Sequence, residues 1–242
     1  MTTLTRIIAT SIISILMLSC NLSMNLGSGI DGNGNVVQVE RAISSDFEEI
    51  KVSHGLDLYI TQTDDVGISI EADENLQDLI MTEVENSVLR IYATENIRQA
   101  ASKKVFLNIE NISAIKATSG SDVFSRNTIE VSNLDLKSTS GADIKLSVKT
   151  KALTCNSTSG SDIKLSGTTI SFKASATSGS DIDASELLAE TSNVKATSGA
   201  DISVNTSKKL MAKATSGGDI EYSGNPQIIE KSDTSAGNIR KQ

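Results

Sequence analysis

The sequence predicts an all-β fold, a single-stranded parallel β-helix whose coils are about 19–20 residues long. The first observation is a five-residue motif, Thr-Ser-Gly-Ser-Asp at Thr118 to Asp122, which we call the phrase. It recurs with small changes up to the C-terminus in steps of 18 to 21 residues. A fixed period near 20 is typical of solenoids, in which each repeat is one turn that buries its neighbours' apolar side chains. The second observation is that apolar and polar residues alternate on both sides of each phrase, which is the period of a strand. A helical solenoid would need apolar spacings of three and four and would not favour Ile, Val and Thr.

Each phrase is predicted to turn a corner at its glycine, with a positive φ that glycine adopts at little cost. The serine before that glycine and the small residue after it are expected to face inward, and the Thr and Asp outward. An earlier segment, Ser53 to Leu58, aligns with the phrase and places Gly55 at the same corner. The predicted corner glycines are therefore Gly55, Gly120, Gly141, Gly160, Gly179, Gly199 and Gly217.

The N-terminus predicts export and lipidation. Residues 1–19 hold one Arg followed by a short apolar run, which is the pattern of a signal peptide. Leu18-Ser19-Cys20 resembles a bacterial lipoprotein cleavage box, so Cys20 is predicted to carry the lipid and tether the mature chain to a bilayer. Ordinary secretion, with Cys20 there by chance, is the alternative. Residues 20–35, rich in Asn, Gly and Ser, are predicted to form a flexible tether.

Residues 36–112 are predicted to be atypical capping coils, which a solenoid needs at its end, and residues 113–242 the regular coils of the same domain. Helical spacing of apolar residues after Asp73 predicts one or two helical turns that Asp73 would cap. His54, the only histidine, takes the slot of the phrase's first serine, where a local hydrogen-bonding role is favoured over catalysis or metal binding. Cys155 falls in an inward column, which favours packing over reactivity.

The charge balance excludes some functions. The formal net charge is −8, and an acidic chain cannot replace the counterions of a nucleic acid. The chain has no Trp, so it lacks the largest aromatic platform for sugars. With a single thiol after Cys20, no intramolecular disulfide is expected in the mature chain.

Stacked coils would place the phrase's aspartates in one line on the outside of the helix. Like charges at the coil spacing of ~4.8 Å repel, so solvent, turn N–H groups or cations must offset them. A solvated ladder that caps the turns is the favoured interpretation; divalent cations are the alternative, because Ca²⁺ prefers carboxylate oxygens. No other cofactor and no definite metal site is predicted. The ladder comprises Asp122, Asp143, Asp162, Asp181, Asp201 and Asp219.

A polysaccharide lyase or hydrolase is the alternative of a different class, because long β-helices often carry such enzymes. Two carboxylates ~5 Å apart would suit a retaining glycosidase. Every coil carries the same Asp, however, so no pair is set apart with its own pKa. The sequence therefore favours a protein that is not an enzyme.

The segment Phe47 to Ile60, the segment Leu89 to Ile91, the N-terminal Cys20 and the tandem coils together resemble the bacterial family named "putative auto-transporter adhesin, head GIN domain" over roughly residues 45–240. The resemblance implies a right-handed parallel β-helix on an exported, often lipid-anchored protein without established enzymatic activity. We therefore expect an adhesin-like or structural binding module, on the outer membrane or cell surface or facing the periplasm. Its expected partners are a membrane through the lipid and a protein or glycan of the envelope, and self-association at the coil ends stays open.

Overall fold

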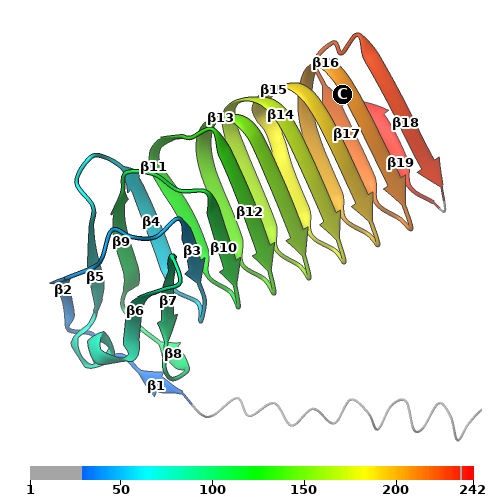
Figure 1. Cartoon of the computed structure of the whole chain (residues 1–242). Coiled ribbons are helices and arrows are strands. Elements are labelled where there is room, and N and C mark those ends of the chain that lie inside the picture. The colour runs from blue at the N-terminus through cyan, green and yellow to red at the C-terminus, as the bar shows by residue number, and fades with distance from the viewer. Residues whose placement is uncertain (1–28, 235) are drawn as a thin grey trace, which may run out of the picture.

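The protein is a β-solenoid, which confirms the predicted fold class. The structure is a computed structural model that describes residues 29–234 and 236–242, and the predicted signal peptide and Cys20 lie outside these residues. Strands follow one another along nearly the whole described chain, and the one helix in these residues is a short 3-10 turn, Glu74–Leu79. Figure 1 shows the coils stacked side by side from the N-terminal to the C-terminal end.

The regular part is built from long strands that bend around the solenoid. These are β13 (Asp143–Thr158), β14 (Asp162–Thr177), β15 (Asp181–Thr197) and β16 (Asp201–Thr215), each paired in parallel with the next. Each strand starts at the Asp that ends one corner phrase and stops at the Thr that begins the next, so a single strand makes up a whole coil. The coil is therefore closed by one sharp corner and one rounded bend (Figure 1).

Two parallel faces result, one on each side of the sharp corner. The first face contains β7 (Val88–Ala93), β3 (Glu49–Val52), β10 (Ala114–Thr118), β12 (Asn133–Thr139), the second halves of β13 to β16, and β18 (Ile228–Thr234). The second face contains β9 (Lys103–Ile109), β4 (Asp57–Gln62), β11 (Asp122–Glu130), the first halves of β13 to β16, β17 (Asp219–Ser223) and β19 (Asn238–Lys241).

The core lies between these faces and is made of columns of side chains in register. One column runs Leu134, Leu153, Phe172, Ser192, Leu210, Ile229 from coil to coil. Its members from Leu134 to Leu210 are buried, whereas 44% of Ile229 in the last coil is exposed. Because alternate residues point inward, each coil buries aliphatic side chains against the coils on both sides of it.

The N-terminal part departs from this regular stacking. β2 (Val36–Arg41) and β9 both pair antiparallel with β5 (Gly67–Asp73), and β6 (Ile80–Glu85) pairs antiparallel with β7. β1 (Ile30–Asp31) and β8 (Ile97–Gln99) form a separate small pair. The helical turn predicted after Asp73 is present, but the Asp73 side chain makes no capping hydrogen bond to it.

Candidate functional site

The repeated phrase forms the sharp corner of every coil. Gly120, Gly141, Gly160, Gly179, Gly199 and Gly217 have φ between 65° and 74°, as predicted for a left-handed turn residue, and Gly55 has 67°. The serine before each glycine also has positive φ, 58° at Ser119 for example, which is uncommon for a residue with a Cβ. Two consecutive residues with left-handed backbone conformation reverse the direction of the chain at the corner of each coil.

The serine before the glycine is exposed, so the prediction that it faces inward was wrong. Only the small residue after the glycine is buried, as at Ser121, Ala142, Ser161, Ser180 and Ala200. The left-handed backbone breaks the alternation of a strand, and counting by twos through the phrase therefore fails at this position. His54 takes the same exposed slot, with φ of 65°, and its Nδ1 lies 2.8 Å from the Ser53 hydroxyl.

Backbone hydrogen bonds continue through the corners from coil to coil. The N–H of Gly141 donates to the carbonyl of Ser159 at 3.2 Å, and the N–H of Gly160 donates to that of Ser178 at 3.3 Å. Inside the corner, the Ser157 hydroxyl donates to the carbonyl of Ser161 at 2.6 Å. The corners are therefore paired as regularly as the strands, which fixes the positions of the residues beside them.

The predicted aspartate ladder exists as a geometric feature. The backbone register places Asp57, Asp122, Asp143, Asp162, Asp181, Asp201 and Asp219 next to one another in this order, and Asn238 ends the line. Partial burial and the neighbouring carboxylate raise the pKa of Asp143, Asp162 and Asp181 above the usual value. Adjacent carboxylates at the strand spacing repel by about 1 kcal/mol in a water-like environment.

Cations act near both ends of the ladder: the charge of Arg240 opposes the raised pKa of Asp201 near the C-terminal end, and two lysines lie near the N-terminal end. Burial raises the pKa of Asp57, and the charges of Lys103 and Lys104 oppose that rise. Lys103 likewise opposes the raised pKa of Asp122, which stems from burial and from Asp57. Among residues 29–234 and 236–242, no three His, Cys, Asp or Glu side chains lie close enough together to hold a metal ion. Calcium binding by the ladder therefore stays a prediction for solution measurement.

Cys155 is a core residue. Its side chain is fully buried, in register with Leu136 on one side and Ala174 on the other. Burial, with a smaller effect of the Asp135 charge, raises the pKa of its thiol well above the usual value. A buried thiol that stays protonated packs like a small apolar side chain.

An outward aromatic stack on the second face was not predicted from the sequence. Phe106, Tyr59 and Phe124 lie in register there, with ring centroids 5.3 Å and 5.2 Å apart. Arg126 lies over the Phe106 ring at 5.8 Å. Tyr59 and Phe124 occupy the same place two residues after an aligned Asp, and this shared offset was the signal available in the sequence.

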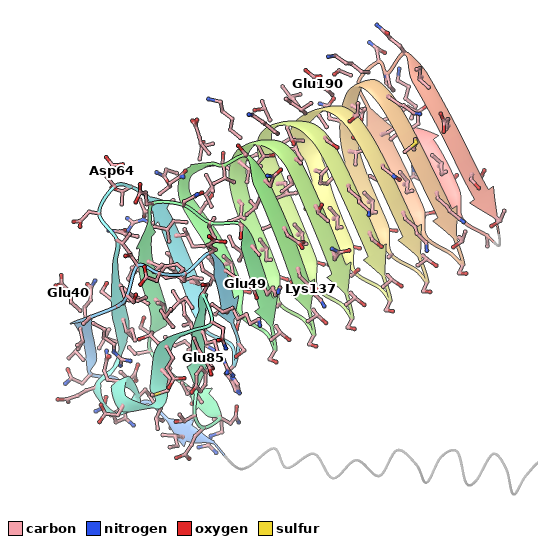
Figure 2. The ribbon with its side chains drawn as sticks, in the orientation of Figure 1. Glu40, Glu49, Asp64, Glu85, Lys137 and Glu190 are labelled. Atoms are coloured by element: carbon pink, nitrogen blue, oxygen red, sulfur yellow. The ribbon has the colours of Figure 1, made fainter. Side chains whose placement is uncertain are left out.

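A groove of about 670 Å³ follows the rounded bend, on the opposite side of the coils from the corners. Its floor includes the exposed apolar side chains Ile170 and Leu188. Ion pairs across neighbouring coils border it, Lys149 with Glu130 at 3.0 Å and Lys208 with Glu190 at 2.6 Å. Figure 2 shows Glu190 on this bend. None of the helices in the described residues is long and apolar enough to span a membrane.

Comparison with known families identifies a match that covers most of the chain. The family described as "Putative auto-transporter adhesin, head GIN domain" matches residues 46–226. Among curated proteins, no sequence matches the chain.

Solved structures show the same fold at low sequence identity. A putative adhesin from Bacteroides fragilis is 21% identical, with a TM-score of 0.82 over 88% of this chain and 100% of the other. A putative adhesin from Parabacteroides merdae is 20% identical, with a TM-score of 0.72 over 89% and 100% of the two chains. A protein described as a putative lipid binding protein from Parabacteroides distasonis is 24% identical, with a TM-score of 0.71 over 88% and 99%.

Proposed function

The chain belongs to the putative auto-transporter adhesin, head GIN domain family, and from that premise we propose that it is a binding module of the bacterial cell envelope. The module is exported, held at a membrane by a lipid on Cys20, and presents its solenoid to a protein or glycan partner. The sequence feature that supports export and lipid anchoring is Leu18-Ser19-Cys20, which follows an apolar run.

The observation that carries the proposal is the uniformity of the outward columns. Thr118, Thr139, Thr158, Thr177, Thr197, Thr215 and Thr234 lie in register along the first face. The aspartates run in parallel with them across the corner. A ligand with a repeating structure can make the same polar contact at each coil, so many weak contacts add up along the solenoid.

Chemical uniformity also disfavours catalysis at the ladder. General acid–base chemistry needs two groups whose environments push their pKa values apart. From Asp143 to Asp181 each aspartate has another aspartate in register on either side, and the pKa of each is raised. A recurring side chain in a recurring environment suits repeated recognition better than a single reaction centre.

The first experiment tests location and anchoring. We expect the full chain to fractionate with membranes, to incorporate labelled fatty acid, and to be cleaved when intact cells are treated with protease. The Cys20→Ala variant should lose the label and leave the membrane fraction. A chain that stays membrane-bound and unlabelled after this change would contradict lipid anchoring through Cys20, and protection from protease would contradict exposure on the cell surface.

The second experiment tests binding. The purified full chain is applied to a panel of envelope polysaccharides and proteins, with each polysaccharide also assayed for cleavage products. We expect saturable binding without turnover. Specific release of sugar products by the chain would contradict a binding module and favour the polysaccharide-active alternative.

A further inference from the structure

A row of four cations crosses the first face at its N-terminal end. The backbone register places Arg90 next to Lys51, Lys51 next to Lys116, and Lys116 next to Lys137. Neighbouring members are therefore separated by the strand spacing of about 4.8 Å. We call these four residues the cation row. Figure 2 shows Lys137 and Glu49 on this face of the solenoid.

The fold itself does not demand charge at these positions. In the next two coils the same column holds Asn156 and then Ser175, in register with Lys137. Those coils stack with the same strand pairing. The four like charges therefore repel one another without being needed for packing, in a chain whose formal net charge is −8.

Carboxylates offset the row only in part. Glu49 is shared, with its Oε1 2.7 Å from the Nζ of Lys116 and 3.4 Å from that of Lys51. The Oε2 atom of Glu85 lies 3.8 Å from Nη1 of Arg90. Within the part of the chain that the structure describes, Lys137 is exposed and has no carboxylate within ion-pair distance. The row thus keeps an excess of positive charge at its Lys137 end.

The cation row lines a groove of about 330 Å³. The other side chains that line this groove are of the kinds that bind sugars. Hydroxyls of Ser53, Thr118 and Thr139 line the groove together with the Tyr92 ring and His54. Arg90 lies over the Tyr92 ring, 5.5 Å from its centroid. Hydroxyls can bond to sugar hydroxyls, and an aromatic face can pack against a sugar ring.

We propose that this groove binds an acidic polysaccharide, with its carboxylate or sulfate groups along the cation row and its sugar hydroxyls on the neighbouring Ser and Thr. This inference rests on the proposed function and assigns it a site and a ligand class. The lining favours a glycan over a nucleic acid, because Ser and Thr hydroxyls suit sugar hydroxyls, whereas the bases of a single strand need aromatic rings to stack on and the groove is lined by one tyrosine, Tyr92. A line of cations also suits a linear polymer better than one isolated anion, which needs donors that converge on it.

The test uses the purified full chain and titration calorimetry at two salt concentrations. The probes are polygalacturonate, dextran sulfate, neutral dextran, and phosphatidylcholine vesicles with and without phosphatidylglycerol. We expect binding of an acidic polysaccharide that weakens with salt, and none of neutral dextran. Lys137→Gln should weaken binding by about threefold or more and reduce the salt dependence by about one charge contact.

Two further variants make the test specific. Lys195→Gln changes the same column outside the row, next to Ser175, and should leave binding unchanged. Glu49→Gln should strengthen binding, because Lys51 and Lys116 lose their shared carboxylate. Equal losses in Lys137→Gln and Lys195→Gln would overturn the assignment of the groove, and so would a Glu49→Gln variant that binds more weakly while circular dichroism shows it folded.

The remaining outcomes separate this inference from the proposed function. Binding to anionic vesicles but to neither acidic polysaccharide would overturn the glycan assignment in favour of a membrane surface. If the variant with Gln at all four positions of the cation row is folded and still binds polygalacturonate or dextran sulfate as the parent chain does, the groove assignment fails while the proposed function stands. If the parent chain binds neither acidic polysaccharide but does bind an envelope protein or another glycan, the groove assignment fails while the proposed function stands; if it also binds nothing among the envelope polysaccharides and proteins, both fail.

Discussion

The two ends of the solenoid differ in whether additional strands cover them: the N-terminal end is covered, or closed, and the C-terminal end is exposed, or open. At the N-terminal end, β2, β5 and β6 add antiparallel strands to the faces and cover the first coils. At the C-terminal end, β18 is exposed along its whole length, and Ile228 and Ile229 are exposed apolar side chains. Figure 1 shows the closed end around β2 and β5 and the open one at β18 and β19.

The difference indicates that stability is graded along the axis. Each repeat of a solenoid is stabilised by its neighbours, so a coil with one neighbour opens more readily than a coil with two. The closed end also contains a buried charge, Asp73, held by three backbone N–H groups. Substitutions at matched positions in the two regions can therefore measure the gradient.

The largest effect is expected for Asp73→Ala at the closed end. The Asp73 carboxylate accepts from the N–H groups of Gly34, Ala101 and Ser102 at 2.8, 2.9 and 3.0 Å. Its loss removes a charged acceptor from all three donors and leaves the buried N–H of Ser102 without a partner, so we expect the free energy of unfolding in urea to fall by about 4 kcal/mol. Asp233→Ala in the exposed β18 is the control and should change it by less than about 0.5 kcal/mol. Equal effects would contradict a closed N-terminal end.

The acid dependence of this contribution follows from the direction of its pKa shift. Burial alone would raise the pKa of Asp73, but the three backbone donors and the N–H of Asp73 itself outweigh burial and hold the pKa below the usual value. The stabilisation is therefore present at neutral pH and is lost as the pH falls through the lowered folded value. The Asp73→Ala variant should lack that acid-induced loss.

Next in size is a comparison within one inward column. Leu153→Ala, in a central coil, should cost about 3 kcal/mol, because the side chain is 1% exposed and leaves a cavity. Ile229→Ala, in the same column of the last coil, should cost less than about 1 kcal/mol. A comparable loss at both positions would show that another surface covers Ile229 in solution, such as a second copy of the chain, which sedimentation would detect.

Two glycines give a smaller pair of effects with opposite sign. Gly160→Ala has open space for a Cβ but a φ of 66°, so we expect a loss of about 1 kcal/mol from backbone strain alone. Gly67→Ala, at the start of β5, also meets nothing within 4 Å and lacks positive φ. It should gain about 0.5 kcal/mol by restricting the unfolded chain. Thermal unfolding of both variants checks the sign, and a loss at Gly67 would contradict the expected gain.

The smallest effect concerns the aspartate ladder. Asp162→Asn, between Asp143 and Asp181, should raise the free energy of unfolding at pH 7 by no more than about 1 kcal/mol, since solvent screens the exposed charges. Because the pKa of Asp162 is raised in the fold, its unfavourable contribution disappears as the pH falls toward the unfolded value of about 3.9. The variant's advantage should therefore shrink in acid.

Asp57→Asn is the control for the ladder, because Lys103 and Lys104 already compensate Asp57. It should gain less than Asp162→Asn. Millimolar Ca²⁺ extends the test: a melting temperature that rises beyond matched ionic strength, and does so less in Asp162→Asn, would show that cations bridge the ladder. A rise that ionic strength alone reproduces would contradict cation bridging.

The regular coils could be predicted because their information is local and repeated. One phrase fixes each corner, the period of two assigns the inward columns, and parallel stacking in register then places every Asp beside the next one. The exposure of the serines could not be predicted in this way, because two successive left-handed residues interrupt the alternation of inward and outward side chains.

Only the tertiary structure decided the N-terminal part and the site built there. Lys51 precedes Arg90 and Lys116 in the chain, yet it lies between them in space, because β3 pairs with β7 on one side and β10 on the other. Asp73, likewise, is held by residues about 30 to 40 positions away. The sequence by itself determined the repeating coil, its glycine corners and its aspartate line, since in-register stacking turns a period into a column. It could not determine which strands meet where the period is absent, because that choice depends on non-local pairing and burial.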